Sequence, residues 1–342
     1  MKITTVLFIL SNIIKTIINI DIIPISMATD DNYIFPTIVS ITTIILNKKN
    51  TTKYDFYIMI PPSLKKENII KLKSLETKYK NNCTINLINM GQKYKNAPTD
   101  NHITTPGYYR LSLPILLPNI NKIIWLDSDT ITHNDLKEMY DLDMTNLYYR
   151  GYLDINPNEV DHITLENDHV ICTGVLLINL DELRKDNMVN VFDKFIKEHS
   201  NLLYKHDQTI INGLCYKKVG FLPPKFAMWN WGTFKDVKYC FDLSKYKYKC
   251  SYQELEDAFY HPVITHCTDK PWKNYKYNYS DVWWNYAYET DFYWEIYKKY
   301  SKLYKKRYKI FFISLSIFFL IVIVIKVVKK KLNDKNIEYK NK

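Results

Sequence analysis

The chain has 342 residues, enough for one large domain or two ordinary ones, and a formal net charge of +11. The excess charge is confined to residues 298–342, which hold 14 basic and 2 acidic residues, whereas residues 1–297 hold 33 basic and 34 acidic ones. A nearly neutral globular part argues against a nucleic-acid-binding protein, which would spread positive charge over one face. Only 7 glycines and no repeat or flexible linker predict one compact unit.

The first 21 residues are expected to form a signal peptide or signal anchor, because Lys2 precedes the apolar run Ile3–Ile14. From residue 22 onward, strand-like runs alternate with helix-like ones. This alternation predicts βαβ units and an α/β fold with a largely parallel sheet. The strand-like runs are Ile22–Ala28, Tyr54–Ile60, Thr84–Ile88, Ile123–Leu126 and Val170–Ile178, and the helix-like runs are Ser63–Tyr79 and Asp181–His199.

The most informative motif follows the fourth of these strands, where IIWL leads into Asp127-Ser128-Asp129. Ligands of open α/β sheets bind beyond the carboxyl ends of the strands, which is where this motif lies. Alternate residues of an extended chain point the same way, so both carboxylates can reach one divalent cation. Mn²⁺ and Mg²⁺ accept carboxylates together with substrate phosphate oxygens.

Segments in the same order along the chain resemble the motifs of the family 8 glycosyltransferases, which include bacterial lipopolysaccharide galactosyltransferases and glycogenin. Together with Asp127-Ser128-Asp129 they span about residues 24–272. The matching segments are a first strand and turn at Ile25–Tyr33, a Y-x-R-L-x-x-P helix at Tyr108–Pro114, a strand at Thr173–Leu180, a D-Q helix at His206–Asn212 with Leu222–Pro224 after it, and His266 with Lys270-Pro271-Trp272.

The resemblance implies a single GT-A-type domain over residues 22–300, with a mixed, mainly parallel sheet flanked by helices. It also implies a retaining, Mn²⁺-dependent transfer (Mg²⁺ being possible) of a hexose, of the UDP-glucose or UDP-galactose type, to a hydroxyl of a glycan, glycolipid or glycoprotein. By resemblance, the metal ligands are Asp127, Asp129 and His266, the nucleotide-binding residues are Ala28, Thr29, Asp30, Asn32, Tyr33 and Lys270, and the sugar-binding residues are Arg110, Asp154, Thr173, Gly174, Asp207 and Gln208.

The sequence also departs from the family pattern. Cys172 replaces the usual asparagine before Thr173, and Thr209 replaces a second aspartate. The loop from His266 to Lys270 is two residues shorter. The change at Cys172 removes an amide from the sugar or acceptor region, so the identity of the donor sugar cannot be taken from the family, while the shorter loop bears on the reach of Lys270.

Two mechanisms remain open for a retaining enzyme. A double displacement would need a carboxylate beneath the anomeric carbon, and Asp207 is the motif carboxylate placed for that. In front-face attack, the leaving phosphate itself accepts the proton, while Asp207 and Gln208 stabilise positive charge on the sugar. We favour the second mechanism.

Beyond the catalytic domain, Ile310–Ile325 is free of charge and extends to Val328. Residues 309–328 are therefore expected to form a transmembrane helix, followed by a basic tail over 329–342. With a working N-terminal signal, the catalytic domain would lie in the lumen of the secretory pathway, where Cys240 and Cys250 could pair. The alternative is a tail-anchored enzyme on the cytoplasmic face.

Two other classes of function are alternatives to an enzyme of this family. One is a catalytically inactive membrane protein that binds a nucleotide sugar on the same fold, against which the retained metal ligands argue. The other is a nucleotidyltransferase, which would carry a glycine-rich phosphate loop near its start. The turn Ala28–Tyr33 holds no glycine.

Overall fold

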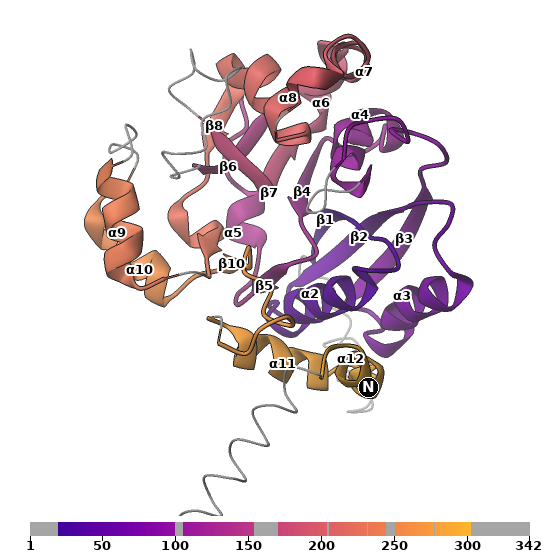
Figure 1. Cartoon of the computed structure of the whole chain (residues 1–342), viewed down its shortest axis with the longest axis vertical. Coiled ribbons are helices and arrows are strands. Elements are labelled where there is room, and N and C mark those ends of the chain that lie inside the picture. The colour runs from indigo at the N-terminus through magenta and orange to yellow at the C-terminus, as the bar shows by residue number, and fades with distance from the viewer. Residues whose placement is uncertain are drawn as a thin grey trace, which may run out of the picture.

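The computed structural model of the protein describes residues 20–99, 105–153, 170–203, 205–230, 232–243, 250–276 and 278–301. Its centre is a seven-stranded sheet in the order β3-β2-β1-β4-β7-β6-β8 (Figure 1). The strands are β1 (Asp21–Ala28), β2 (Thr52–Ile60), β3 (Cys83–Asn89), β4 (Lys122–Leu126), β6 (Tyr149–Leu153), β7 (Ile171–Asn179) and β8 (Val219–Phe221).

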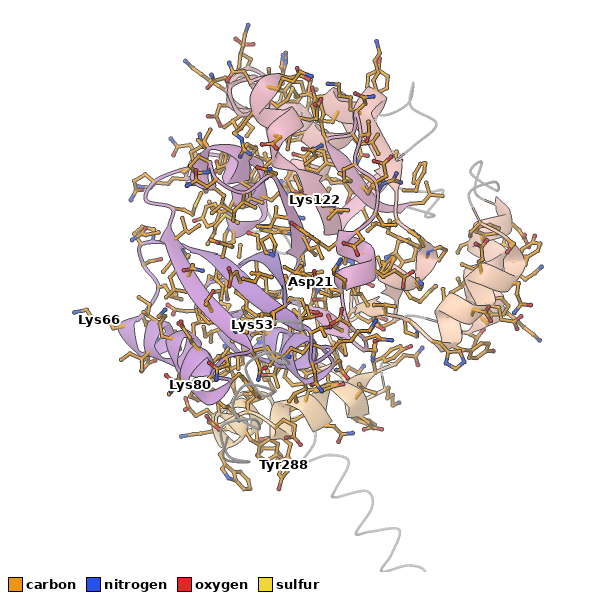
Figure 2. All side chains as sticks on the ribbon, turned by 180° about the vertical axis from the view of Figure 1, so that it is seen from behind. Asp21, Lys53, Lys66, Lys80, Lys122 and Tyr288 are labelled. Atoms are coloured by element: carbon orange, nitrogen blue, oxygen red, sulfur yellow. The ribbon has the colours of Figure 1, made fainter. Side chains whose placement is uncertain are left out.

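The expectation of a mixed sheet is confirmed. β3, β2, β1 and β4 pair in parallel, β7 runs antiparallel to both β4 and β6, and β8 is parallel to β6. Because β1, β2 and β4 are parallel, their carboxyl ends meet at one edge. Asp21 and Lys122, the first residues of β1 and β4, and Lys53, the second residue of β2, belong to the opposite ends of these strands and are labelled in Figure 2.

Helices cover both faces of the sheet, which explains why the run Ile123–Leu126 of β4 is apolar and buried without interruption. In β4, Ile124 and Leu126 pack in one buried cluster with α2 (Ile34–Leu46) and α3 (Lys66–Lys78). Ile123 and Trp125 point the opposite way into a second cluster with the chain around η1 (Thr105–Ser112), α4 (Leu113–Leu116), α6 (Leu180–Lys185), α7 (Met188–Glu198) and α8 (Asp207–Cys215).

One predicted helix is interrupted. The range 181–199 forms α6 and α7, because Asn187 adopts a left-handed conformation with φ of 53° between them. Asparagine tolerates that conformation better than most residues.

A small three-stranded sheet joins β5 (Thr130–Thr132), β10 (Ile264–His266) and β9 (Met228–Trp229) beside the main sheet. The helices α11 (Ser280–Tyr288) and α12 (Tyr293–Tyr300) lie next to α2, while α9 (Phe234–Leu243) and α10 (Tyr252–Tyr260) project to one side (Figure 1). The remaining short helices are α5 (Lys137–Tyr140), η2 (Ser200–Leu202), η3 (Tyr216–Lys218) and η4 (Pro224–Phe226).

The prediction of a fold that includes a membrane-spanning helix requires correction. Across the described ranges, no helix combines the length and the apolar character needed to cross a bilayer. The two longest there, α2 and α3, have 13 residues each, against about 20 for a span. The described part of the chain is therefore an α/β domain in which no helix spans a membrane, and it does not support the predicted membrane contact through Ile310–Val328 or the single-pass localisation.

The segments on which those predictions rested, residues 309–328 and the tail 329–342, lie outside the described residues, as do residues 1–19 of the expected signal. β1 already begins at Asp21, the last residue of that expected segment. Cys240 and Cys250, which a lumenal domain could have paired, are free thiols.

Candidate active site

The candidate site lies where β1 and β4 end side by side. Ala28 is the last residue of β1, and Asp127 follows β4 directly. Ser128, between the two aspartates, points away from them and links the strand ends. Its hydroxyl donates to the carbonyl oxygen of Ala28 at 2.9 Å and lies 2.8 Å from that of Thr37 on α2. The alternation of an extended chain thus sends the serine into the scaffold and leaves both carboxylates facing the site.

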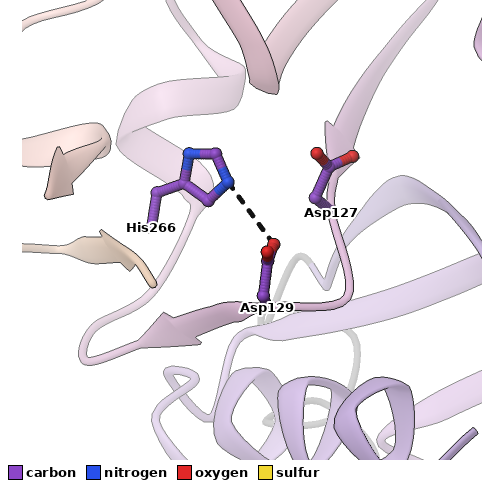
Figure 3. Close-up of side chains that lie close together, drawn as sticks. All are labelled: Asp127, Asp129 and His266. Carbon is purple, nitrogen blue, oxygen red and sulfur yellow. Dashed lines mark ion pairs between the residues drawn. The ribbon is translucent and has the colours of Figure 1, made fainter. Parts of the chain in front are cut away.

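His266 reaches the two aspartates through the small sheet. β10 pairs antiparallel with β5, with His266 opposite Thr130, and the amide of Cys267 donates to the carbonyl oxygen of Asp129 at 2.8 Å. One ligand atom from each of Asp127, Asp129 and His266 lies within 4.8 Å of the others (Figure 3). The three predicted metal ligands are therefore together in the fold.

Asp129 lies between Lys270 and His266. It is buried; its Oδ2 pairs with the Lys270 ammonium, and its Oδ1 lies 3.4 Å from Nε2 of His266 without a hydrogen-bond partner. Burial alone would raise the pKa of Asp129, but Lys270 and His266 together hold it below its usual range. For His266, burial favours the neutral ring, yet the attraction of Asp129 outweighs it and raises the pKa to about 10.

This arrangement fits a divalent cation. A buried carboxylate oxygen without a hydrogen-bond partner faces an imidazole nitrogen, and the half-exposed carboxylate of Asp127 lies beside them. Oxygen ligands with one imidazole suit Mn²⁺ better than Ca²⁺. Hence Asp127, Asp129 and His266 form a possible site for such an ion.

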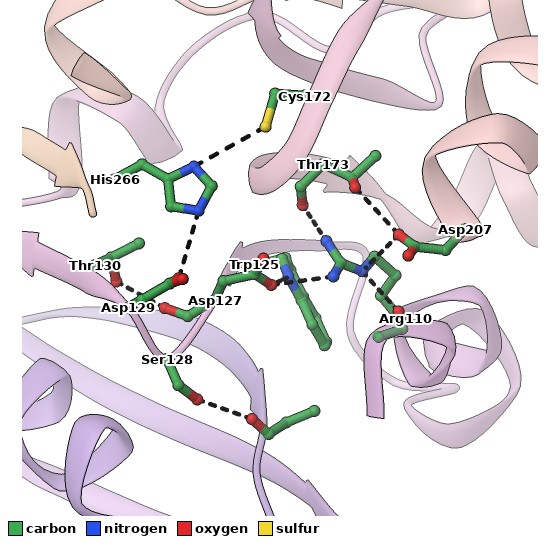
Figure 4. Close-up of polar contacts among 12 residues, drawn as sticks. Arg110, Trp125, Asp127, Ser128, Asp129, Thr130, Cys172, Thr173, Asp207 and His266 are labelled. Atoms are coloured by element: carbon green, nitrogen blue, oxygen red, sulfur yellow. Dashed lines mark hydrogen bonds and ion pairs between the residues drawn. The ribbon is translucent and has the colours of Figure 1, made fainter. Parts of the chain in front are cut away.

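Arg110, on η1, connects the possible metal group (Asp127, Asp129 and His266) to Asp207 at the start of α8. Its guanidinium is buried and lies 3.0 Å from Oδ1 of Asp127 and 3.1 Å from Oδ2 of Asp207 (Figure 4). It also donates to the carbonyl oxygen of Thr173 and stacks on Trp125, 4.4 Å from the ring centre. Burial would lower the pKa of Arg110, but the two carboxylates reverse this and raise it. Arg110 therefore remains charged and places Asp127 and Asp207 on opposite sides of one cation.

Of three consecutive residues of β7, two lie against His266 and one contacts Asp207. Cys172 Sγ lies 3.9 Å from Nδ1 of His266, and Gly174 packs so closely that a Cβ there would be 2.2 Å from Cε1 of the same ring. Thr173 points the other way, and its hydroxyl donates to Asp207 at 3.1 Å. Gly174, predicted to bind sugar, thus makes room for His266, a predicted metal ligand.

Asp207 is buried and engaged on its Oδ2 by Arg110 and Thr173. Burial raises the pKa of this carboxyl, an effect that Arg110 opposes. Gln208 follows it on α8 and is half-buried. Asp154 lies outside the described residues, one position beyond the end of β6.

The predicted nucleotide turn lies next to the metal group. The carboxylate of Asp30 accepts hydrogen bonds from the amides of Asn32 and Tyr33 at 2.9 and 3.0 Å, so it organises the turn itself. Thr29 is buried and bonded to Thr37 rather than facing outward. The ring of Tyr33 meets Trp272 edge-on, which places the turn against the loop that carries Lys270.

Sequence reasoning missed the contacts of Trp125, Cys172 and Gly174. The indole of Trp125 donates to Oδ1 of Asp127 at 2.8 Å, two residues further along the chain and just past the end of β4. Period-two alternation could have suggested that contact. The contacts of Cys172 and Gly174 with His266 had no signal in the sequence, because they depend on where β10 packs.

Comparison with known proteins agrees with this geometry. The sequence model of "Glycosyl transferase family 8" matches residues 24–276. Among curated proteins, the chain is 30% identical over 206 residues to a predicted glycosyltransferase of Haemophilus influenzae, covering 58% of this chain and 61% of that protein. It is 26% identical over 280 residues to general stress protein A of Bacillus subtilis, covering 79% and 94%.

A lipopolysaccharide 1,2-glucosyltransferase of Escherichia coli is 27% identical over 281 residues, with 80% of this chain and 77% of that protein covered. The crystal structure of the galactosyltransferase LgtC, in complex with donor and acceptor sugar analogues, superposes with a TM-score of 0.67 at 19% identity, covering 79% of this chain and 96% of LgtC. That likeness concerns the fold, which is GT-A-like. Because the family match spans most of the chain, and named glycosyltransferases are among its relatives, the chain belongs to glycosyl transferase family 8.

Proposed function

We propose that the protein is a retaining glycosyltransferase that moves a hexose from a UDP-sugar to a hydroxyl of a glycan, glycolipid or glycoprotein. The observation that carries this proposal is the shared position of Asp127, which belongs to the possible metal group and also contacts Arg110, the partner of Asp207. A diphosphate bound at the metal group would thus present its sugar toward Asp207. The diphosphate of a nucleotide sugar would thus lie at the metal group, and its sugar would lie beside Asp207 and Arg110.

Asp127, Asp129 and His266 would hold the cation, with Mn²⁺ as the first candidate and Mg²⁺ as the second. A cation bound there supplies Lewis-acid charge that neutralises the leaving diphosphate. The ammonium of Lys270, already at Asp129, is close enough to add a second positive charge. The turn from Ala28 to Tyr33 would bind the base and ribose.

On the sugar side, we infer front-face attack. The acceptor oxygen forms the new bond to the anomeric carbon as the bond from that carbon to the phosphate oxygen breaks, and the acceptor proton passes to this phosphate oxygen. Asp207 supports this choice, since Arg110 and Thr173 already occupy one of its oxygens. As a carboxylate beside Arg110, Asp207 would stabilise positive charge on the sugar electrostatically. Gln208 is expected to assist, and Asp154 to bind sugar hydroxyls.

UDP-glucose and UDP-galactose are the first donors to test, because the named relatives include a glucosyltransferase and the fold relatives a galactosyltransferase. The experiment is donor hydrolysis, measured as UDP release from a panel of UDP-sugars with Mn²⁺, with Mg²⁺ and with a chelator. We expect release of UDP from one of these hexose donors with Mn²⁺ and none in the chelator.

Asp127→Ala and Asp129→Ala are the matched controls and should remove the activity. Full activity in the chelator would refute the metal assignment. Tight UDP-sugar binding without hydrolysis, and without transfer to any acceptor sugar in a screen, would instead favour an inactive binding protein.

A further inference from the structure

We propose that the end of α12, through Lys299 and Tyr300, completes the nucleotide site by holding the turn at residues 30–33 in its binding shape. The inference rests on the proposed function, since it presumes that this turn binds UDP. It concerns a part of the chain beyond the family match, which ends at residue 276. Lys299 and Tyr300 act through the turn and are therefore positioning residues.

The contacts are made to the carbonyl side of the turn. The Lys299 ammonium donates to the carbonyl oxygens of Asp31 and Asn32 at 3.3 and 3.1 Å, and the hydroxyl of Tyr300 donates to that of Asn32 at 3.4 Å. On the opposite side, the Asp30 carboxylate accepts from the amides of Asn32 and Tyr33. The same peptide units are thus held from both directions, which leaves few alternative conformations.

Tyr300 also ties this contact to the loop that carries Lys270. Its ring lies 6.4 Å from that of Trp272 and 6.3 Å from that of Trp283. Trp272 in turn meets Tyr33 edge-on at 6.1 Å. One aromatic group therefore joins the end of α12 to the nucleotide turn and to the residue two positions after Lys270.

α12 is itself anchored, so it can serve as a support. Its Ile296 is fully buried, and Glu295 forms an ion pair of 3.1 Å with Lys71 on α3. The side chain of Asp31 also contacts α3, where it accepts a hydrogen bond from Nδ2 of Asn68 at 2.7 Å. α3 and α12 together therefore fix the turn from outside the sheet.

A turn held in advance binds its ligand without the cost of ordering it. Removal of the Lys299 ammonium should consequently weaken UDP binding and raise the KM for the donor, while kcat changes little because the reacting groups are untouched. Lys299 is solvent-exposed in part, so the expected loss of UDP affinity is moderate, about three- to tenfold.

The test measures binding of UDP with Mn²⁺ by calorimetry to the wild type, Lys299→Met and Lys298→Met. Methionine keeps the aliphatic stem and removes the ammonium, and Lys298 is an exposed neighbour on the same helix. We expect weaker UDP binding in Lys299→Met alone, with unchanged affinity for Mn²⁺ without nucleotide and an unchanged melting temperature. Tyr300→Phe, which removes one hydroxyl, should give a smaller effect in the same direction.

If Lys299→Met binds UDP as tightly as Lys298→Met does, the inference is overturned while the proposed function stands. If the wild type itself fails to bind UDP with Mn²⁺, both are overturned. A parallel loss of UDP affinity and of Mn²⁺ affinity would also overturn the inference, since it would mean a general loss of structure rather than a loosened turn.

Discussion

Gly174→Ala should displace the His266 ring and weaken metal binding without removing any ligand. The three atoms nearest to a Cβ at position 174 all belong to that ring, at 2.2, 2.6 and 2.9 Å. Ordinary van der Waals contact begins near 3.4 Å. The nearest ring atom must therefore withdraw by about 1.2 Å, or the backbone of β7 must move, and overpacking of this kind typically costs about 1–3 kcal/mol of stability.

The effect on the metal should be larger than the effect on the fold. Contacts that orient a metal ligand are typically worth about 10–100-fold in affinity, and we expect Gly174→Ala to lose that much Mn²⁺ affinity. The assay is titration of Mn²⁺ followed by electron paramagnetic resonance, with thermal unfolding measured in parallel. His266→Ala alone should also weaken binding, because it removes the ligand.

The decisive comparison is a double-mutant cycle. Once His266→Ala has removed the ring, the added methyl group meets none of the three atoms, so Gly174→Ala should have little further effect on Mn²⁺ affinity in that background. Independent, additive losses would refute the reasoning that the glycine acts through His266. Wild-type Mn²⁺ affinity in Gly174→Ala alone would refute it as well.

Three further predictions concern titratable groups. Because Lys270 occupies Oδ2 of Asp129, Lys270→Met should bind Mn²⁺ more tightly in the absence of nucleotide. The same variant should bind UDP with Mn²⁺ more weakly. Unchanged or weaker binding of Mn²⁺ alone would contradict a competition between the Lys270 ammonium and the metal ion for Asp129. Asp207→Asn should lower turnover by about 10²–10³-fold and leave UDP affinity nearly unchanged, and a glycosyl adduct trapped on Asp207 in mass spectrometry would overturn front-face attack. His133 is held neutral, because burial lowers its pKa from 6.5 to about 4 while its Nε2 lies 2.9 Å from the Thr265 hydroxyl. The stability that the neutral His133 contributes is complete above pH 6.5 and is lost as the pH falls toward 4, by at most about 3 kcal/mol. Chemical denaturation should therefore show that the free energy of unfolding falls more steeply with decreasing pH in the wild type than in His133→Gln.

The sequence by itself determined the β1–β4 framework and the position of the two carboxylates. An uninterrupted apolar run such as Ile123–Leu126 predicts a strand buried on both faces, and the helices found on both sides of β4 agree with it. The carboxylates of Asp127 and Asp129 face the same site because alternation is a property of a few consecutive residues. Such local patterns need no information from the rest of the chain, whereas the break between α6 and α7 depended on one backbone conformation at Asn187 that no periodicity reveals.

Only the tertiary structure decided how the distant residues serve the site. His266 reaches Asp129 because β10 pairs with β5, and Gly174 matters because β7 passes directly against that imidazole ring. Arg110 would be read from its sequence as an exposed charge on a helix, yet it is buried between Asp127 and Asp207. Lys299 lies beyond every recognised motif and still contacts the predicted nucleotide turn. These contacts join residues far apart in the chain, so they arise from the packing of whole elements rather than from the pattern within any one of them.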